Sequence, residues 1–286
     1  MPEKSIPIQV VTWNVRFQGA RILDALKGQP DVLTLQEVTF DQRSDFKKRL
    51  GVMGLKCCPD SQRHTGGKRY GNLIASRWKI DPVTPRYSRE KPPWPELLVQ
   101  ASVSVNGRSF LVISVHIPNG AGYGCKKIDT FNALRDAVRE AKGKACIVTG
   151  DFNEPQYTLQ NGRIVTWGQE WDARQRRFVC WPPWKDRSGR LGSGKKWDSA
   201  VRWLFEKQNE HRLRHAYWEA HGHGAMAVSH VTRGQPRWFD HMFVSPHFCV
   251  ELCEYLLELR GPGLSDHSAL KAKLLLKAED GSPSPP

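Results

Sequence analysis

The nine residues IVTGDFNEP, at positions 147–155, join a run that suits a buried strand to an acid and an amide. Ile147 and Val148 are β-branched, and such residues favour strands. Asp151 and Asn153 follow almost at once. Because Asp and Asn are common turn residues that bond their own backbone, this stretch alone favours a plain turn. A functional role needs support from the rest of the chain.

The composition is that of a folded, basic protein. Of the 286 residues, 39% are apolar and 11 are Trp, which is enough for a large core. The net charge is +14, from 43 basic and 29 acidic residues. Such an excess bears on partners and not on fold, and it favours a polyanion: nucleic acid or an anionic membrane. The alternative is a basic protein whose charge only aids solubility.

The sequence carries no sign of export or of membrane insertion. Residues 1–11 lack the basic-then-apolar plan of a secretory signal, and no apolar run approaches the ~20 residues of a membrane span. The seven Cys are odd in number and unevenly spaced, so reduced thiols are the simplest interpretation. We therefore expect a cytoplasmic protein; the sequence does not indicate its oligomeric state.

Short apolar runs that end in polar, Gly or Pro residues predict a series of strands. The expected strands are 8–13, 32–38, 71–76, 97–105, 109–117, 146–152, 238–245 and 268–276. Asn106-Gly107 predicts a hairpin between the fourth and fifth of them. Helical spacing predicts helices over 20–27 and 128–142. Without a repeat or a linker, we expect one domain over 1–277 and a flexible Pro/Ser tail over 278–286.

A Trp- and Arg-rich excursion spans about 158–218. Seven of the 11 Trp lie between Trp167 and Trp218, interleaved with basic residues. Aromatic rings stack on bases and cations hold phosphates, so this pattern is typical of a nucleic-acid surface. The alternative is a structured excursion whose Trp side chains pack on the body. We favour packing for most of the Trp and binding for the basic cluster in 185–196, which includes Lys195 and Lys196.

Six apolar runs end in, or lead to, oxygen-rich or His side chains. Open sheets place ligands beyond strand ends in this way, so these residues predict one convergent site at a sheet edge. The residues concerned are Asn14, Glu37, His116, Asn119, Asp151, Asn153, Asp240, Asp266 and His267.

Five short motifs make the chain resemble the endonuclease/exonuclease/phosphatase superfamily, which includes deoxyribonuclease I and exonuclease III-type nucleases. The motifs, in the family's order, are TWNV (12–15), LQEV (35–38), GDFN (150–153), FDHMFVS (239–245) and SDHSAL (265–270). The resemblance covers nearly the whole chain. It implies an α/β fold in which two packed mixed β-sheets are flanked by helices, a four-layer α-β-β-α sandwich.

Phosphodiester hydrolysis needs neutralised phosphate charge, an aligned water and a proton for the leaving oxygen. Oxygen ligands without thiolates suit Mg²⁺, with Mn²⁺ as an alternative. Glu37 is the first candidate ligand. By resemblance, Asn14 lies beside it and Asp266 lies at or near the same metal.

The resemblance also implies roles for the remaining residues of the predicted site. Asp151 orients or deprotonates the water, and Asn153 holds water or phosphate oxygen. A carboxylate that fixes an imidazole supports its charged form, as expected for Asp240 and His267. His116 is expected to assist the leaving group.

The predicted substrate contacts are less strongly marked. Arg16 stands where exonuclease III-type members often carry an acid, and it is expected to contact phosphate, as is Asn119. Arg69 lies in the basic, Gly-rich loop 63–71, which contains no acid to pair with His116. The other His residues we expect to be structural or exposed, namely His64, His211, His215, His221, His223, His230 and His247.

The charge and the resemblance together predict a Mg²⁺-dependent DNA endonuclease. One alternative is a phosphodiesterase or phosphatase acting on a small or lipid head-group phosphate. The other is a catalytically inactive nucleic-acid-binding member.

Overall fold

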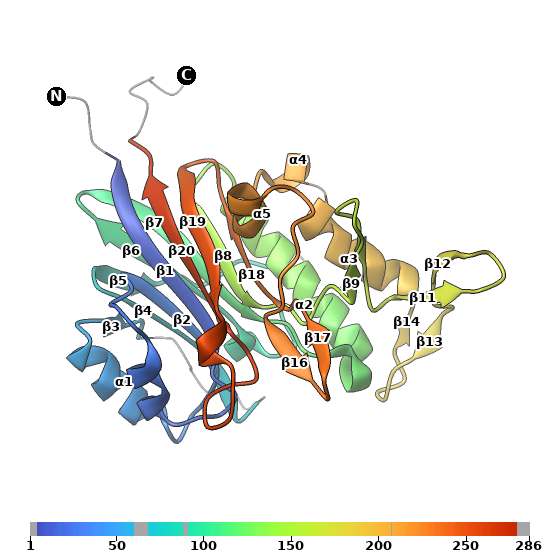
Figure 1. Cartoon of the computed structure of the whole chain (residues 1–286), viewed down its shortest axis with the longest axis horizontal. Helices are drawn as coiled ribbons and strands as arrows, with labels where there is room; N and C mark the ends of the chain where they lie inside the picture. The colour runs from blue at the N-terminus through green and yellow to red at the C-terminus, as the bar shows by residue number, and fades with distance from the viewer. Residues whose placement is uncertain (1–4, 60–67, 88–90, 207, 279–286) are drawn as a thin grey trace.

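Two six-stranded mixed sheets pack face to face in the computed structural model, which describes residues 5–59, 68–87, 91–206 and 208–278 (Figure 1). In spatial order, the first sheet consists of β19 (Phe248–Leu256), β20 (Ala269–Leu276), β1 (Ile6–Asn14), β2 (Val32–Thr39), β4 (Tyr70–Ser76) and β3 (Lys56–Cys57). The second consists of β15 (Arg214–His215), β18 (Asp240–Val244), β8 (Cys146–Asp151), β7 (Arg108–His116), β6 (Leu98–Val105) and β5 (Lys79–Pro82).

Helices cover the outer faces of both sheets. On the first sheet lie the 3₁₀ turn η1 (Ala20–Ala25) and α1 (Arg43–Val52), and on the second lie α2 (Gly120–Glu140) and α3 (Gly194–Glu206). Shorter helices complete the described chain: η2 (Pro95–Leu97), α4 (Gln208–His211), α5 (Ala216–His221) and η3 (Leu257–Leu259). The layers confirm the four-layer sandwich expected from the sequence.

Strand alternation explains the layers. Along β1, Ile8 and Val10 lie in the core between the sheets, whereas Val11 and Trp13 pack under α1. Successive strand residues point to opposite faces, so a strand buried on both sides reads as an almost continuous apolar run. The second sheet repeats this arrangement, with Val112 between the sheets and Ile113 against α2.

Strand pairing brings the polar strand ends to one edge. β1 and β2 are parallel, as are β7 and β8, so each pair ends at the same side. β18 is antiparallel to β8, and the pair Asp240 and Asp151 lies at the beginning of one strand and the end of the other. β20 is antiparallel to β1 and starts just after His267. All six predicted segments therefore meet at one edge.

The helices differ from the sequence prediction in three respects. Residues 20–25 form a 3₁₀ turn and not an α-helix, because Gly28 and Pro30 leave too short a run. α2 begins at Gly120, eight residues before the expected start. The helix α1 was not predicted, since its sequence RSDFKKRLGV carries only two buried side chains. Of the tail expected over 278–286, residues 279–286 lie outside the described residues.

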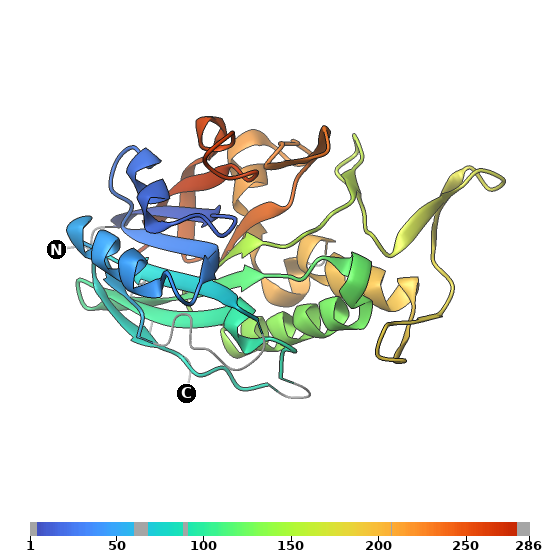
Figure 2. The same cartoon turned by 90° about the horizontal axis from the view of Figure 1, so that it is seen from below.

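Residues 169–192 form a projecting arm, which we call the arm below. It contains β11 (Gln169–Asp172), β12 (Arg177–Cys180), β13 (Trp184–Lys185) and β14 (Leu191–Gly192) (Figure 2). The rest of the predicted excursion packs on the body, including α3. Two further small hairpins are β9 (Tyr157–Thr158) with β10 (Ile164–Val165), and β16 (His230–Thr232) with β17 (Gln235–Arg237).

All seven Cys are free thiols, and Cys57 alone is half-buried while Cys180 and Cys249 are exposed. Burial raises the pKa of the Cys146 and Cys253 thiols to about 12, so they are inert. No helix in the described ranges is long and apolar enough to cross a membrane.

Two neutral imidazoles, His215 on β15 and His241 on β18, lie in the core. The Trp218 N–H donates to His215 Nδ1 at 3.4 Å, so His215 Nε2 carries the hydrogen and donates to His241 Nδ1 at 2.9 Å. His241 Nε2 then donates to the carbonyls of Glu154 and Trp238, at 2.9 and 3.0 Å. Every ring nitrogen has a partner only while both rings are neutral. Burial accordingly lowers the pKa of His215 well below 6.5 and that of His241 to about 4.

These two imidazoles predict loss of stability on acidification. Below pH 6.5 the unfolded chain binds a proton at His215 and His241 that the folded chain does not bind, so the free energy of unfolding falls as the pH falls toward 4. Each imidazole contributes about 1.4 kcal/mol per pH unit in that window. Urea unfolding between pH 7 and pH 5 measures the slope. His241→Gln should lower the slope by about 1.4 kcal/mol per pH unit, whereas the exposed-site control His223→Gln should leave it unchanged. An equal slope in His241→Gln contradicts the assignment.

Candidate active site

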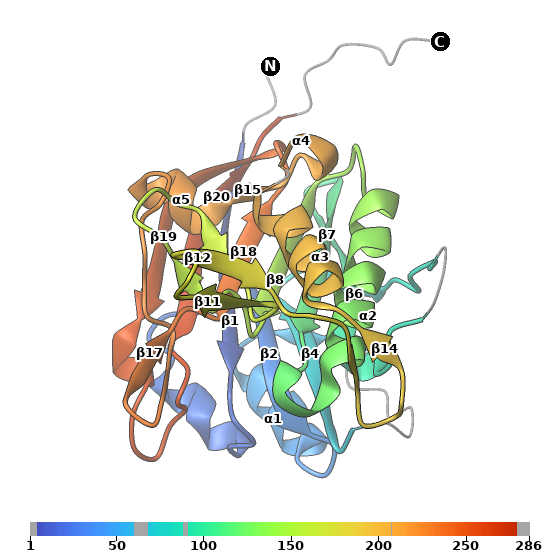
Figure 3. The ribbon, with the colours of Figure 1, turned by 90° about the vertical axis from the view of Figure 1, so that its right-hand side faces the viewer.

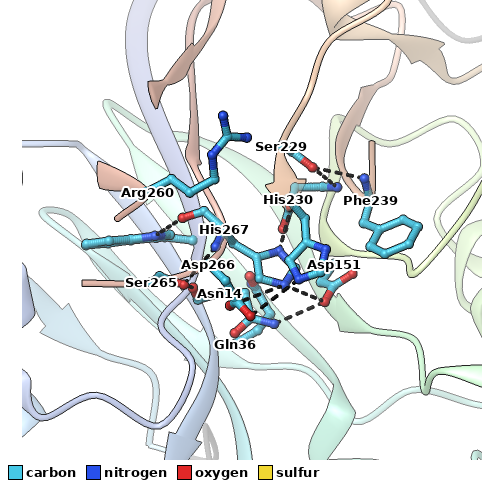
Figure 4. A network of polar contacts seen from close by, with 12 residues as sticks. Asn14, Gln36, Asp151, Ser229, His230, Phe239, Arg260, Ser265, Asp266 and His267 are labelled. Atoms are coloured by element: carbon cyan, nitrogen blue, oxygen red, sulfur yellow. Dashed lines mark hydrogen bonds and ion pairs between the residues drawn. The ribbon is translucent and has the colours of Figure 1, made fainter. Parts of the chain in front are cut away.

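Asp151 lies at the centre of the polar edge and is 1% exposed (Figure 4). Its Oδ2 accepts a hydrogen bond from Asn14 Nδ2 at 3.0 Å. The same atom accepts another from Asn153 Nδ2 at 3.3 Å. Its Oδ1 accepts from the Asn153 N–H at 2.8 Å. Gly150 precedes it with φ +141°, and a Cβ there would lie 2.0 Å from the Val115 carbonyl oxygen. The Gly of the GDFN motif therefore lets β8 approach β7 closely.

Glu37 reaches the same centre through a bulge in β2. The register with β4 shifts between Leu35 and Val38, and Glu37 has a left-handed φ of 57°. A bulge re-aims a side chain, and such a φ is costly for a non-Gly residue, which is a mark of functional sites. Glu37 Oε1 accepts from Asn14 Nδ2 at 3.2 Å. One amide thus contacts both Glu37 and Asp151.

His116 faces both carboxylates. Its Nε2 lies 3.6 Å from Glu37 Oε1 and 3.7 Å from Asp151 Oδ2, while its Nδ1 is buried without a hydrogen-bond partner. Loop 63–71 contains no acid that could pair with this His. The carboxylates that lie beside His116 come instead from β2 and β8.

Asp240 and His267 form a buried pair, as the sequence predicted. His267 Nδ1 donates to Asp240 Oδ2 at 2.8 Å, and His267 Nε2 points toward Asp151 Oδ2 at 3.8 Å. Burial alone would lower the pKa of His267, but the charges of Asp240 and Asp151 outweigh it and raise the pKa to about 10. His267 is therefore an imidazolium at neutral pH, with its Nε2–H aimed into the site.

Trp13 and Ser265 hold the segment that carries this imidazolium. Trp13 is fully buried and its Nε1–H donates to the His267 carbonyl at 3.0 Å. Ser265 Oγ donates to the Asn14 carbonyl at 2.6 Å and accepts from the His267 N–H at 3.0 Å. These motif residues position Asn14 and His267 relative to each other.

Asp266 lies between two basic side chains. Arg16 Nε lies 3.3 Å and His230 Nε2 lies 3.4 Å from its Oδ2, and its buried Oδ1 has no hydrogen-bond partner. Burial would raise the pKa of Asp266, but the neighbouring His230, His267 and Arg16 lower it below its ordinary value.

His230, which was expected from the sequence to be structural or exposed, lies at the site beside Asp266 and His267. It is buried, its ring lies 4.2 Å from that of His267, and the two residues form an isolated β-bridge. A lone His in a short polar hairpin carries no motif, so periodicity could not have found it. Only the pairing of β16 with the segment before β20 brings it to the site.

The donor set fits a hard divalent cation. The site offers carboxylate and amide oxygens, and Asp266 Oδ1 accepts no hydrogen bond that would compete with a cation. Among the described residues, two groups of carboxylates and imidazoles have all their ligand atoms within 4.8 Å of one another. One is Asp151, Asp240 and His267, and the other is His230, Asp266 and His267. Glu37 joins this cluster through Asn14 and His116. The contacts therefore run continuously from Glu37 to Asp266.

The predicted substrate contacts occupy different places. Arg16 borders the cluster, with a side chain that is 58% exposed. Arg69 and Asn119 are exposed, at the start of β4 and in the connection between β7 and α2. Lys195 and Lys196 are exposed in the first turn of α3. The basic cluster over 185–196 spans part of β13, the turn that follows it, β14 and the start of α3.

A family model described as the Endonuclease/Exonuclease/phosphatase family matches residues 11–267. The chain belongs to this family. No curated protein matches the chain significantly by sequence.

Solved structures with the same fold come from several family branches. A 3′ phosphatase from Neisseria, bound to a product DNA hairpin, is 22% identical with a TM-score of 0.60, and the match covers 93% of this chain and 98% of that one. An AP endonuclease from Archaeoglobus fulgidus is 16% identical, with the same coverage and TM-score. ANGEL2, a 2′,3′-cyclic phosphatase, is 16% identical with a TM-score of 0.58, over 96% and 97% of the two chains. At these identities the likeness establishes the fold.

A buried ion pair supports the family's GDFN segment from behind. Lys127, on α2, is 1% exposed and its Nζ donates to the Asn153 carbonyl at 2.7 Å. The same Nζ lies 3.1 Å from Glu154 Oε1, which also accepts from Trp197 Nε1 at 2.6 Å. Asn153 itself has a left-handed φ of 49°. The pair therefore ties α2 and α3 to the residue that contacts Asp151.

Removing one partner of this pair should destabilise the protein strongly. Lys127→Met leaves the Glu154 carboxylate buried without its cation, which costs about 3–5 kcal/mol. Urea unfolding at neutral pH gives the loss. Lys142→Met, which changes an exposed residue just after α2, should cost under about 0.5 kcal/mol. Equal effects of the two substitutions would show that the pair is unimportant.

Proposed function

We propose that the protein is a Mg²⁺-dependent nuclease that hydrolyses phosphodiester bonds in DNA as an endonuclease. The observation that carries the proposal is the unbroken set of contacts from Glu37 through Asn14, Asp151 and His267 to Asp266. Membership of the family supports the reaction class, since its members include nucleases and phosphatases.

In this proposal Glu37, Asn14 and Asp266 hold Mg²⁺, or Mn²⁺ in its place. The bound ion supplies neutralisation of the charge on the scissile phosphate. The unpartnered Asp266 Oδ1 and the exposed part of Glu37 support the assignment, because both offer oxygen to a ligand at this edge. Asn14 keeps its place through the Arg16 N–H, which donates to its Oδ1 at 3.0 Å.

The other polar residues handle the water and the protons. Asp151 accepts the proton of the attacking water, while Asn153 orients it, in line with the hydrogen bonds that hold both side chains. The His267 imidazolium, charged through Asp240, stabilises the negative charge that develops on the phosphate oxygens. His116 assists the leaving oxygen.

A nucleic acid substrate is supported by charge and by aromatic surface. Arg16, Asn119 and Arg69 are proposed to contact phosphates near the site, with Lys195 and Lys196 further along the strand. The Tyr70 ring lies 5.7 Å from the His116 imidazole, and Phe17 lies edge-on to Tyr70 at 5.0 Å.

Phe17 is 46% exposed and has a left-handed φ of 59°. A strained, exposed aromatic residue at the mouth of a site suits stacking on a nucleobase.

The domain organisation and the cellular location are also part of the proposal. We propose that residues 1–277 act as one catalytic domain and that the protein works in the cytoplasm, where its seven thiols stay reduced.

Glu37→Ala should lower plasmid cleavage in Mg²⁺ by at least about a hundredfold, because the ion loses its first carboxylate. EDTA should abolish cleavage, and Mg²⁺ or Mn²⁺ should restore it. The matched control Glu258→Ala, at an exposed position, should cleave like the unmodified protein. Undiminished cleavage by Glu37→Ala would contradict the metal assignment.

A substrate panel separates the rival functions. The panel comprises plasmid, single-stranded DNA, abasic duplex, RNA and a p-nitrophenyl phosphodiester. Turnover of the small ester alone would favour a phosphodiesterase on small or head-group phosphates, and ANGEL2 shows that the fold also serves a cyclic phosphatase. Salt-sensitive DNA binding without turnover would favour an inactive binding member.

A further inference from the structure

The arm over residues 169–192 is rooted rigidly in the body. Its Trp181 N–H donates to the Gly168 carbonyl at 3.0 Å, and the Gly194 N–H donates to the Trp181 carbonyl at 3.2 Å. A Cβ on Gly194 would lie 2.3 Å from both the Gly168 oxygen and the Trp181 nitrogen. Only Gly fits this crossing. The close backbone contact fixes the direction in which the arm leaves the body.

A row of Trp side chains runs from the core into the arm. Trp197 is 3% exposed and lies 6.0 Å from Trp184, which lies 6.2 Å from Trp181. Trp181 is 40% exposed, and Trp171 further out is 55% exposed. Packing on the body therefore explains the presence of the inner Trp side chains. It does not explain Trp171, which is the most exposed of the four.

The outer hairpin of the arm presents a small aromatic surface. Trp171 and Phe178 are directly opposite each other in the β11–β12 pair, with ring centroids 5.2 Å apart. Because a two-stranded hairpin buries little, its tip gains stability only from such a pair and from its turn. The outer face of Trp171 remains open to a ligand.

Cations flank this aromatic pair. Asp172 Oδ1 accepts hydrogen bonds from the backbone N–H groups of Arg174 and Gln175, so this carboxylate is engaged in the turn. Arg174 and Arg176 are exposed, and neither forms an ion pair within the described residues. Arg190, nearer the root, instead bonds both oxygens of Asp129. The charge of Arg190 at the root is thus neutralised by Asp129 of the body, while Arg174 and Arg176 keep the tip positively charged.

We propose that the tip of the arm binds an unpaired nucleic acid strand away from the cleaved bond. Bases stack on Trp171 beside Phe178, and Arg174 and Arg176 hold the adjacent phosphates. The arm projects on the side of the molecule at which β7 and β8 end, and from that side it lies in front of the sheets (Figure 3). A strand that leaves the active site can therefore extend to the arm.

The test measures binding without hydrolysis, by fluorescence anisotropy in EDTA. The probes are labelled single-stranded DNA and RNA of roughly 20 nucleotides, a blunt duplex and a trinucleotide. Trp171→Ser should weaken binding of a long single strand about tenfold and leave the trinucleotide unchanged. Arg174→Ser with Arg176→Ser should reduce the salt slope by about 1.4, or about 0.7 for each phosphate that is no longer neutralised. An effect with DNA alone or with RNA alone supports the proposal and identifies the strand.

Matched controls separate a local effect from a general one. Lys142→Ser with Lys144→Ser removes two exposed cations just beyond α2 and should leave the long-strand affinity within about twofold. Near-UV circular dichroism confirms that each variant is folded. Unchanged affinity in Trp171→Ser, or weakening seen only with duplex, overturns the proposal.

This inference rests on the proposed nuclease function for its substrate class, yet the two can fail separately. If Trp171→Ser leaves long-strand binding unchanged while plasmid cleavage persists, the arm proposal fails and the nuclease stands. If cleavage is absent but long-strand binding depends on Trp171, the arm proposal stands and the nuclease fails.

Discussion

One hydrogen bond joins the two sheets at the point on which the site depends. Asn14, at the end of a strand in the first sheet, donates to Asp151, at the end of a strand in the second. The same amide contacts Glu37. Parallel pairing places β1 with β2 and β7 with β8, and the packing of the two sheets brings these four strand ends to one edge. Residues that are far apart in the chain thereby become neighbours.

The electrostatics of this edge follow from that convergence. Four buried or half-buried carboxylates, those of Glu37, Asp151, Asp240 and Asp266, repel one another in a small volume, and burial adds to the cost. The protein offsets the repulsion with the His267 imidazolium and with Arg16 beside Asp266. Oxygen atoms that lack a partner remain, on Asp240 and on Asp266. The carboxylate oxygens of such a site attract a divalent cation. The charge of a bound cation would in turn attract the phosphate of a substrate.

The sequence predicted the sandwich and the polar edge because both are local patterns in strands: apolar runs that end in an acid, an amide or a His. It could not predict contacts that depend on packing between elements. His230 reaches the site through a β-bridge, and Lys127 supports Asn153 from a helix whose pattern reads only as core. The Glu37 side chain is redirected by a β-bulge, and no residue in LQEV predicts that bulge. The arm was recognised by composition, but its rigid root required the close approach at Gly194.

The central claim is that side chains from both sheets share one divalent cation at this edge. Anomalous diffraction from crystals soaked in Mn²⁺ tests it directly. The account predicts a peak about 2.1 Å from a Glu37 carboxylate oxygen, with Asn14 or Asp266 as a further ligand directly or through water. A peak bound only by His230 and Asp266, or no peak beside Glu37, would contradict the account.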